Sequence, residues 1–226
     1  MNIGAKKILI KNFIFDCDGV LYSDLEKVFG QVSKRMTEYI AKKLNLDLKK
    51  AKELQTNYFH KYNTSLNGLM VHHKINPKDF LDYVHDIDLN FLKKDLILRE
   101  ELLKLNAKKI VFTNGSNDHV NNITKHLGIN DLFNGIFDIV DCNFIPKPSI
   151  EPYKKLTKKF KIDPKETVFI EDIAKNLEPA KKLGMKTVWL KNNEYWGKKD
   201  SDKDFIDLKI ENLSSFLKEI NILKAA

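Results

Sequence analysis

The second half of the chain alternates short apolar runs with amphipathic stretches, and this rhythm constrains the fold more than any other feature. The apolar runs cover 110–112, 137–140, 167–170, 187–190 and 206–210. Helical patterns lie between or after them, over 117–127, 149–160, 175–183 and 214–222. Strands that alternate with helices pair in parallel through right-handed crossovers. We therefore expect an α/β protein with a parallel sheet and helices on both faces.

An earlier apolar run, 6–15, precedes two aspartates that are one residue apart. We interpret this run as a buried strand, so that Asp16, Asp18 and Gly19 follow it at the edge where parallel sheets bind ligands. Two carboxylates this close repel each other unless a cation bridges them or one of them holds a proton. The alternative interpretation is an Asp-Gly turn in which Asp16 only caps the strand in solvent.

Residues 22–105 differ from the rest, since they have helical periodicity and no convincing strand pattern. Apolar residues recur every three or four positions over 25–44, and Asp47 is suited to cap a second helix. We therefore predict an all-helical cap domain over 22–105. It is inserted after the first strand of a catalytic core that consists of 1–21 and 106–226.

Polar side chains follow the ends of several predicted strands. Thr113 and Asn114 follow the second strand, Lys147 lies in the loop after the third, and Glu171 and Asp172 follow the fourth. These ends meet at one edge of a parallel sheet, where the acids would form an all-oxygen site that suits Mg²⁺. The hydroxyl, amide and ammonium groups bind phosphate. Each feature alone also occurs in turns, helix caps and surfaces, but their order indicates a phosphoryl-transfer site.

This order of motifs resembles the haloacid dehalogenase superfamily of phosphohydrolases. The matching motifs are Asp16-x-Asp18-Gly19-Val20, Thr113-Asn114-Gly115, Lys147-Pro148, and Glu171-Asp172 followed by Asn176. The resemblance covers essentially the whole chain. It implies a Rossmann-like core and Mg²⁺ as the cofactor.

The resemblance also implies a role for each residue. Asp16 is the expected nucleophile, which forms an aspartyl-phosphate, and Asp18 is the expected general acid and base. Lys147 is expected to steady the nucleophile, while Thr113 and Asn114 bind the phosphate. The expected Mg²⁺ ligands are Asp16, the Asp18 backbone carbonyl, Asp172 and, as an open fourth candidate, Glu171.

Several segments are similar to the pyrimidine 5′-nucleotidase branch of that superfamily. They are 13–22, the segment with Tyr62, Gly68-Leu69 and His73-Lys74, and the stretches 127–133 and 175–187. Members of that branch remove phosphate from nucleoside monophosphates such as UMP and CMP, and some act on other small phosphate esters. His73 and Lys74 are our candidates for substrate contacts, against the alternative that this helix face is only solvated. A sugar-phosphate phosphatase and a phosphomutase are the alternative functions on the same scaffold.

The net charge of +8 raises a non-enzymatic alternative, a basic RNA-binding protein. The basic residues are nearly all lysine, with Arg35 and Arg99 as the only arginines, and no basic run interleaves with aromatic residues. Proteins that bind specific nucleic-acid sequences commonly contact bases through arginine, and proteins that bind single strands stack the bases on aromatic side chains. We therefore expect a small phosphorylated metabolite as the partner and no nucleic acid.

The sequence also bears on the location of the protein. No apolar stretch approaches the roughly 20 residues that a membrane span needs, and the N-terminus lacks a secretory signal pattern. Cys17 and Cys142 are too few for a disulfide scaffold and suit a reducing compartment. We expect a cytoplasmic enzyme without membrane contact.

Overall fold

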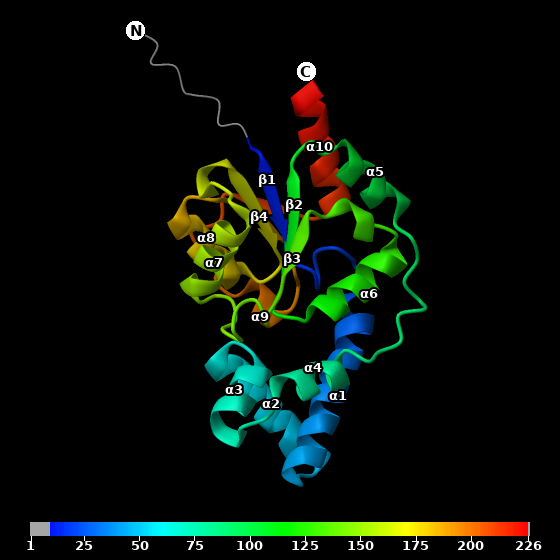
Figure 1. Ribbon diagram of the computed structural model, residues 1–226, viewed down its shortest axis with the longest axis vertical. Coiled ribbons are helices and arrows are strands. Elements are labelled where there is room, and N and C mark those ends of the chain that lie inside the picture. Colours follow the sequence, from blue (N-terminus) through cyan, green and yellow to red (C-terminus); the bar gives the residue numbers. More distant parts are fainter. Residues whose placement is uncertain (1–9, 226) are drawn as a thin grey trace.

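A six-stranded parallel sheet forms the centre of the computed structural model, which describes residues 10–225 (Figure 1). The strands are β1 Asn12–Phe15, β2 Lys108–Phe112, β3 Gly135–Phe137, β4 Thr167–Glu171, β5 Lys186–Leu190 and β6 Leu208–Ile210. Their order is β3-β2-β1-β4-β5-β6. The chain therefore adds β2 and β3 on one side of β1, and then β4, β5 and β6 on the other side. This reversal places a topological switch point between the ends of β1 and β4. The predicted α/β fold class is confirmed.

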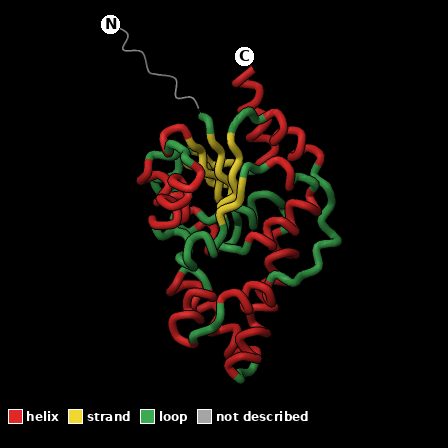
Figure 2. The backbone as a smooth tube through the Cα atoms, in the orientation of Figure 1, coloured by secondary structure: helices red, strands yellow, loops and turns green. Residues whose placement is uncertain are grey.

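Helices cover both faces of the sheet (Figure 2). On one face lie α5 Leu96–Lys104, α6 Asn117–Leu127 and α10 Leu213–Ala225, and on the other lie α7 Ile150–Phe160 and α8 Leu177–Leu183. Side chains alternate across a strand, so Phe13 and Phe15 pack toward the first group and Ile14 toward the second. All three are at most 1% exposed, which explains the continuous apolar run in β1. The short helices are η1 Asn130–Leu132, η2 Pro164–Glu166, η3 Ala174–Asn176 and α9 Tyr195–Lys198.

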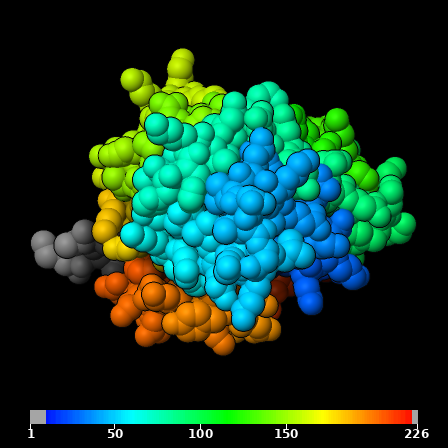
Figure 3. Space-filling model, turned by 90° about the horizontal axis from the view of Figure 1, so that it is seen from below, coloured from blue at the N-terminus to red at the C-terminus, as the bar shows by residue number. Residues whose placement is uncertain are grey.

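Four helices between β1 and β2 form a separate helical lobe at one end of the sheet (Figure 1). They are α1 Leu25–Leu44, α2 Leu48–Tyr62, α3 Ser65–His73 and α4 Pro77–Val84. Asp47 caps α2 by accepting a hydrogen bond from the backbone N–H of Lys50, as its position predicts. Viewed from below, the lobe covers this end of the molecule, with the orange segment around α9 along one side (Figure 3).

The helix α5 lies with the sheet and packs against α10. The side chain of Asn221 on α10 donates to the backbone carbonyl of Glu101 on α5, at 3.0 Å. The predicted cap range, 22–105, therefore contains one helix that packs on the core side. The division into a core and a cap domain stays a prediction.

The third strand is shorter and earlier than the predicted run 137–140. It ends at Phe137, because Asp138 Oδ1 accepts hydrogen bonds from the backbone N–H groups of Val140 and Asp141. Such a turn, closed by an aspartate side chain, takes the chain out of the sheet. Part of the predicted first strand, residues 6–9, lies outside the described residues. Within 10–225, every helix is too short or too polar to cross a membrane.

Candidate active site

The two aspartates of the first motif follow directly on β1. The backbone N–H of Asp16 donates to the carbonyl of Ile170 on β4 at 3.0 Å, so this residue is still anchored to the sheet. Gly19 then adopts a left-handed φ of +77°, which glycine reaches without steric cost. A Cβ at Gly19 would lie 2.3 Å from Asp172 Oδ2. Only glycine lets the loop after β1 approach the end of β4 this closely.

Lys147 is buried among the acids. Its Nζ lies 2.9 Å from Asp16 Oδ1 and 2.7 Å from Glu171 Oε2, and it donates to the carbonyl of Phe112 at 3.0 Å. Burial would lower the pKa of Lys147, but Asp16 and Glu171 outweigh it and raise this pKa above its ordinary value. The ammonium group therefore stays charged. Burial, followed by the charge of Glu171, raises the pKa of Asp16 despite the neighbouring lysine.

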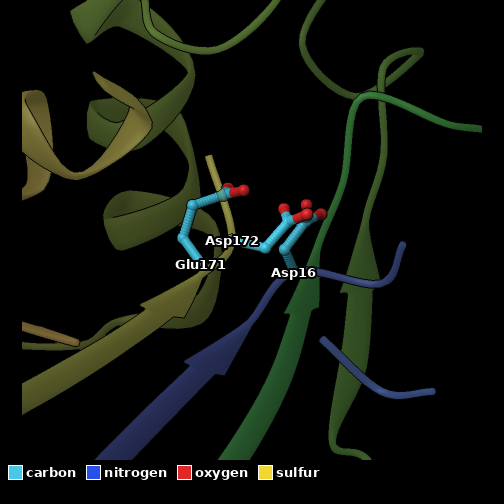
Figure 4. Close-up of side chains that lie close together, drawn as sticks. All are labelled: Asp16, Glu171 and Asp172. Carbon is cyan, nitrogen blue, oxygen red and sulfur yellow. The ribbon is translucent and has the colours of Figure 1, made fainter. Parts of the chain in front are cut away.

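Asp16, Glu171 and Asp172 form a cluster of buried carboxyl groups above the ends of β1 and β4 (Figure 4). Each offers one oxygen, and these oxygens lie within 4.8 Å of one another. Both oxygens of Glu171 are engaged, Oε2 by Lys147 and Oε1 by a backbone N–H at 3.2 Å. Asn192 donates to Asp172 Oδ2 at 2.7 Å, whereas the buried Oδ1 has no hydrogen-bond partner among the described residues. Burial, followed by the charge of Asp16, raises the pKa of Asp172 to about 7.

These residues fit Mg²⁺. With all acids ionised, three carboxylates and one ammonium give this buried cluster a net charge of −2 (−3 + 1). A divalent cation would balance that charge, and hard oxygen donors are the ligands that Mg²⁺ takes. The unpartnered oxygen of Asp172 makes it a better ligand than Glu171, whose oxygens already have partners. The ligand expected from Asp18 is its backbone carbonyl, and its carboxyl group is not part of the cluster.

Two neighbours hold the carboxyl group of Asp18. The Tyr22 hydroxyl donates to Asp18 Oδ1 at 2.5 Å, and His119 Nε2 lies 2.9 Å from the same oxygen. Burial would raise the pKa of Asp18, but His119 and Tyr22 outweigh it and lower this pKa to about 2. Asp18 is therefore a carboxylate at neutral pH and can accept a proton.

Thr113 and Asn114 lie beside these acids, as their place after β2 predicts. Thr113 is 1% exposed, and its Oγ1 accepts a hydrogen bond from the backbone N–H of Gly115 at 2.9 Å. Asn114 Oδ1 accepts one from the backbone N–H of Lys147 at 2.8 Å, so it also fixes the loop that carries the lysine. One cavity of about 320 Å³ is lined by Asp16, Asp18, Thr113, Asn114, Lys147 and Asp172.

This cavity extends from the sheet edge into the helical lobe. Three of the aromatic residues that line it have neighbouring rings, Phe29 of α1, Phe59 of α2 and Trp196 of α9. The ring centroid of Trp196 lies 6.2 Å from that of Phe29 and 6.3 Å from that of Phe59. Lys175 and Asn63 line it as well, and the Lys175 ammonium donates to Asn63 Oδ1 at 3.1 Å, which links core and lobe.

The structure does not bring His73 and Lys74 to this cavity. Both are exposed at the C-terminal end of α3, and neither is among the residues that line the cavity. His73 Nε2 instead pairs with the hydroxyl of Tyr58 at 2.8 Å. Ser65 and Leu66 at the other end of α3 do line the cavity, and a linear motif does not reveal which end of the helix faces the site.

Sequence reasoning missed two histidines that lie at the site, His85 and His119. Their rings stack with centroids 4.2 Å apart, and burial followed by the His119 charge lowers the pKa of His85 to about 3. A signal was available for His119, since it falls on the buried face of α6 beside Val120 and Ile123. A buried histidine in the helix after a phosphate-binding turn could have been flagged as a site residue.

A family model of haloacid dehalogenase-like hydrolases matches residues 10–184. The chain belongs to this family. The superfamily predicted from the motif order is thereby confirmed, and so is the prediction of an enzyme.

Two curated relatives of this haloacid dehalogenase-like hydrolase align with most of its length. It is 31% identical over 193 residues to phosphate metabolism protein 8 of Saccharomyces cerevisiae, which covers 77% of this chain. The chain spans 60% of that relative's length. It is 26% identical over 240 residues to a glyceraldehyde 3-phosphate phosphatase of Methanocaldococcus jannaschii, which covers 96% of this chain and 99% of the relative. The name of the second relative supports a phosphatase of the family, and neither name specifies the pyrimidine 5′-nucleotidase branch.

Solved structures of other proteins share the fold. A phosphatase from Thermococcus onnurineus superposes with a TM-score of 0.63 at 19% identity, covering 93% of this chain and 98% of that one. CbbY from Rhodobacter sphaeroides, solved with phosphate, gives a TM-score of 0.62 at 16% identity over 92% of this chain and 96% of that one. At such identities the likeness establishes the architecture alone.

Proposed function

We propose that this hydrolase is an Mg²⁺-dependent phosphatase that cleaves a small phosphate monoester through an aspartyl-phosphate on Asp16. One observation carries the proposal. Asp16 lies 2.9 Å from a buried lysine and in one carboxyl cluster with Asp172, whose Oδ1 has no hydrogen-bond partner among the described residues, and all three residues line one cavity. This arrangement offers a nucleophile, a cation and a cation-binding acid to one phosphate group. Asp16 and Asp172 would hold Mg²⁺, which would offset the repulsion between the phosphate and the carboxylates.

In the first step, a carboxylate oxygen of Asp16 attacks the phosphorus atom, and the bond between phosphorus and the leaving oxygen breaks. Lys147 offsets the charge on the phosphate oxygens, while Thr113 and Asn114 orient them. Asp18 takes up a proton from solvent as the phosphate binds and then delivers it to the leaving oxygen. A phosphate dianion next to Asp18 raises the proton affinity of its carboxylate, since like charges disfavour the ionised form.

In the second step, a water molecule attacks the phosphorus atom of the aspartyl-phosphate. Asp18, now ionised, accepts a proton from this water, and the bond between phosphorus and the Asp16 oxygen breaks. Inorganic phosphate leaves and Asp16 is restored as a carboxylate. Once phosphate has left, the low pKa of Asp18 returns this proton to solvent and restores the carboxylate.

The proposed substrate is a nucleoside 5′-monophosphate such as UMP or CMP, with the helical lobe acting as a cap over the site. The aromatic residues Phe29, Phe59 and Trp196 in the cavity lining support a planar base, because bases stack on aromatic rings. A triose phosphate is the second candidate, favoured by the relative from Methanocaldococcus jannaschii. A three-carbon leaving group would fill only part of a cavity of about 320 Å³. We assign the activity to the cytoplasm, where both buried free cysteines would stay reduced.

The test is phosphate release from UMP, CMP, AMP, glyceraldehyde 3-phosphate and hexose phosphates, with Mg²⁺ or with EDTA. Asp16→Asn is the matched control, since it keeps the shape of the side chain and removes the nucleophile. We expect Mg²⁺-dependent release led by UMP and CMP, and none from the variant. Release led by a triose or hexose phosphate would keep the chemistry and overturn the nucleotide assignment. Turnover by Asp16→Asn at the wild-type rate would overturn the mechanism, and turnover only with a bisphosphate activator would indicate a mutase.

A further inference from the structure

His119 is buried at the catalytic edge and contacts a catalytic side chain, although it belongs to none of the family motifs described above. It is 1% exposed and lies in the first turn of α6. Its Nε2 lies 2.9 Å from Asp18 Oδ1, a contact between residues 101 positions apart in the chain. Its other ring nitrogen, Nδ1, is buried and has no hydrogen-bond partner among the described residues. A carboxylate oxygen only accepts, so Nε2 carries the proton of this contact and donates it to Asp18.

Tyr22 supplies a second donor to the same oxygen. Its hydroxyl lies 2.5 Å from Asp18 Oδ1, and the side chain is almost fully buried. Two donors from different elements, the loop after β1 and α6, fix the rotation of the carboxyl group. Because both bonds end on Oδ1, the other oxygen, Oδ2, is left for the leaving group of the substrate.

The ring of His119 is itself held in place. It stacks on His85 at 4.2 Å between centroids, with 18° between the ring planes. His85 Nδ1 in turn pairs with Ser116 Oγ at 2.9 Å, and this hydroxyl also accepts the backbone N–H of His119 at 3.3 Å. Supports of this kind are what keep a catalytic group within productive geometry.

We propose that His119, assisted by Tyr22, is a positioning residue that turns Asp18 Oδ2 toward the leaving-group oxygen. The inference rests on the proposed phosphatase function and adds a residue to it. Asp18 protonates the leaving oxygen only in the correct orientation, and a displacement of about 1 Å can cost about 10²-fold in rate. The loss should depend on the leaving group, because a good leaving group departs without a proton.

The experiment measures kcat/KM, which reports the steps up to departure of the leaving group, for an alkyl phosphate, phenyl phosphate and p-nitrophenyl phosphate with Mg²⁺. His119→Phe keeps a ring and removes the donor, and His119→Gln retains an N–H donor. His126→Phe is the matched control, the same substitution at a half-buried histidine of α6 whose Nδ1 pairs with its own helix at Asn122 O.

For His119→Phe we expect a loss of about 100-fold with the alkyl phosphate and less than about threefold with p-nitrophenyl phosphate. His119→Gln should recover part of the loss, and His126→Phe should match the wild type. An equal loss for all three substrates would overturn the positioning role and leave His119 a packing residue. If His119→Phe does not fold, Tyr22→Phe, which removes one hydroxyl, is measured instead with the same three substrates. Its loss should depend on the leaving group in the same way. If the wild type hydrolyses none of the three esters and none of the nucleotide and sugar phosphates of the first panel, the proposed function fails and not this inference alone.

Discussion

Lys147 and Glu171 form a fully buried ion pair, with Nζ and Oε2 2.7 Å apart and side chains that are 1% and 0% exposed. A buried charge is tolerated only with a well-placed partner, so this pair fixes the lysine that faces Asp16. The pair also explains why Glu171 and Asp172, though adjacent in the sequence, have different surroundings. Glu171 holds the lysine, and Asp172 Oδ1 has no hydrogen-bond partner within residues 10–225.

The first prediction separates these two acids by their effect on the Mg²⁺ requirement. Asp172→Asn should raise the Mg²⁺ concentration for half-maximal activity by more than tenfold, given that even the outer partners of metal ligands are worth about 10–100-fold in affinity. Glu171→Gln should lower kcat by about tenfold or more through Lys147, since one preorganised donor is worth about 10²–10³. Its Mg²⁺ requirement should stay within about threefold of the wild type. Titrating Mg²⁺ while measuring phosphate release checks both variants. Equal changes in the Mg²⁺ concentration for half-maximal activity would contradict the separate roles of Asp172 and Glu171.

The second prediction concerns stability. In EDTA at neutral pH, Asp172→Asn should unfold at a higher temperature than the wild type, because it reduces the negative charge of the buried cluster. With saturating Mg²⁺ the order should reverse. A ligand at 100 times its Kd stabilises by about 2.7 kcal/mol. At this chain length each kcal/mol shifts Tm by about 2–4 °C. Thermal unfolding followed by circular dichroism measures the Tm of both proteins with EDTA and with Mg²⁺. A wild-type Tm that is the same with and without Mg²⁺ would refute the cation site.

The third prediction uses two glycines as a matched pair. Gly19→Ala places a Cβ 2.3 Å from Asp172 Oδ2 at a φ of +77°. It should destabilise by about 1–3 kcal/mol, and it should weaken the response to Mg²⁺. Gly30→Ala, in the exposed middle of α1 with nothing within 4 Å of the new Cβ, should stabilise by about 0.5–1 kcal/mol. Urea unfolding compares the two, and a neutral Gly19→Ala would show that the loop can move away from Asp172.

The fourth prediction tests which part of the lobe contacts the substrate. Trp196→Ala should raise the KM for UMP by about tenfold or more, since base stacking on an aromatic ring is worth about 1–3 kcal/mol. It should change the KM for glyceraldehyde 3-phosphate little. His73→Ala, at an exposed residue outside the cavity, should leave both values within about twofold. If His73→Ala instead raised the KM for UMP, the substrate would contact His73 and Lys74, as the sequence suggested.

The sequence by itself determined the α/β class, the strand that ends in Asp16, and the group of polar residues at the strand ends. These follow from local rules. Apolar runs set the strands, and parallel pairing brings their carboxyl ends to one edge, so Thr113, Lys147 and Asp172 meet without further information. The end of β3 was missed because a side-chain turn at Asp138 overrides the apolar pattern that continues beyond it.

Only the tertiary structure decided which side chains outside the motifs reach the site. His119 contacts Asp18 across 101 residues, and Trp196 reaches the cavity from α9, contacts that depend on how helices pack. His73 and Lys74 lie outside for the same reason, because the orientation of α3 within the lobe turns its C-terminal end to solvent. Periodicity specifies which face of a helix is apolar, but the direction of that face relative to a distant site is set by packing between elements.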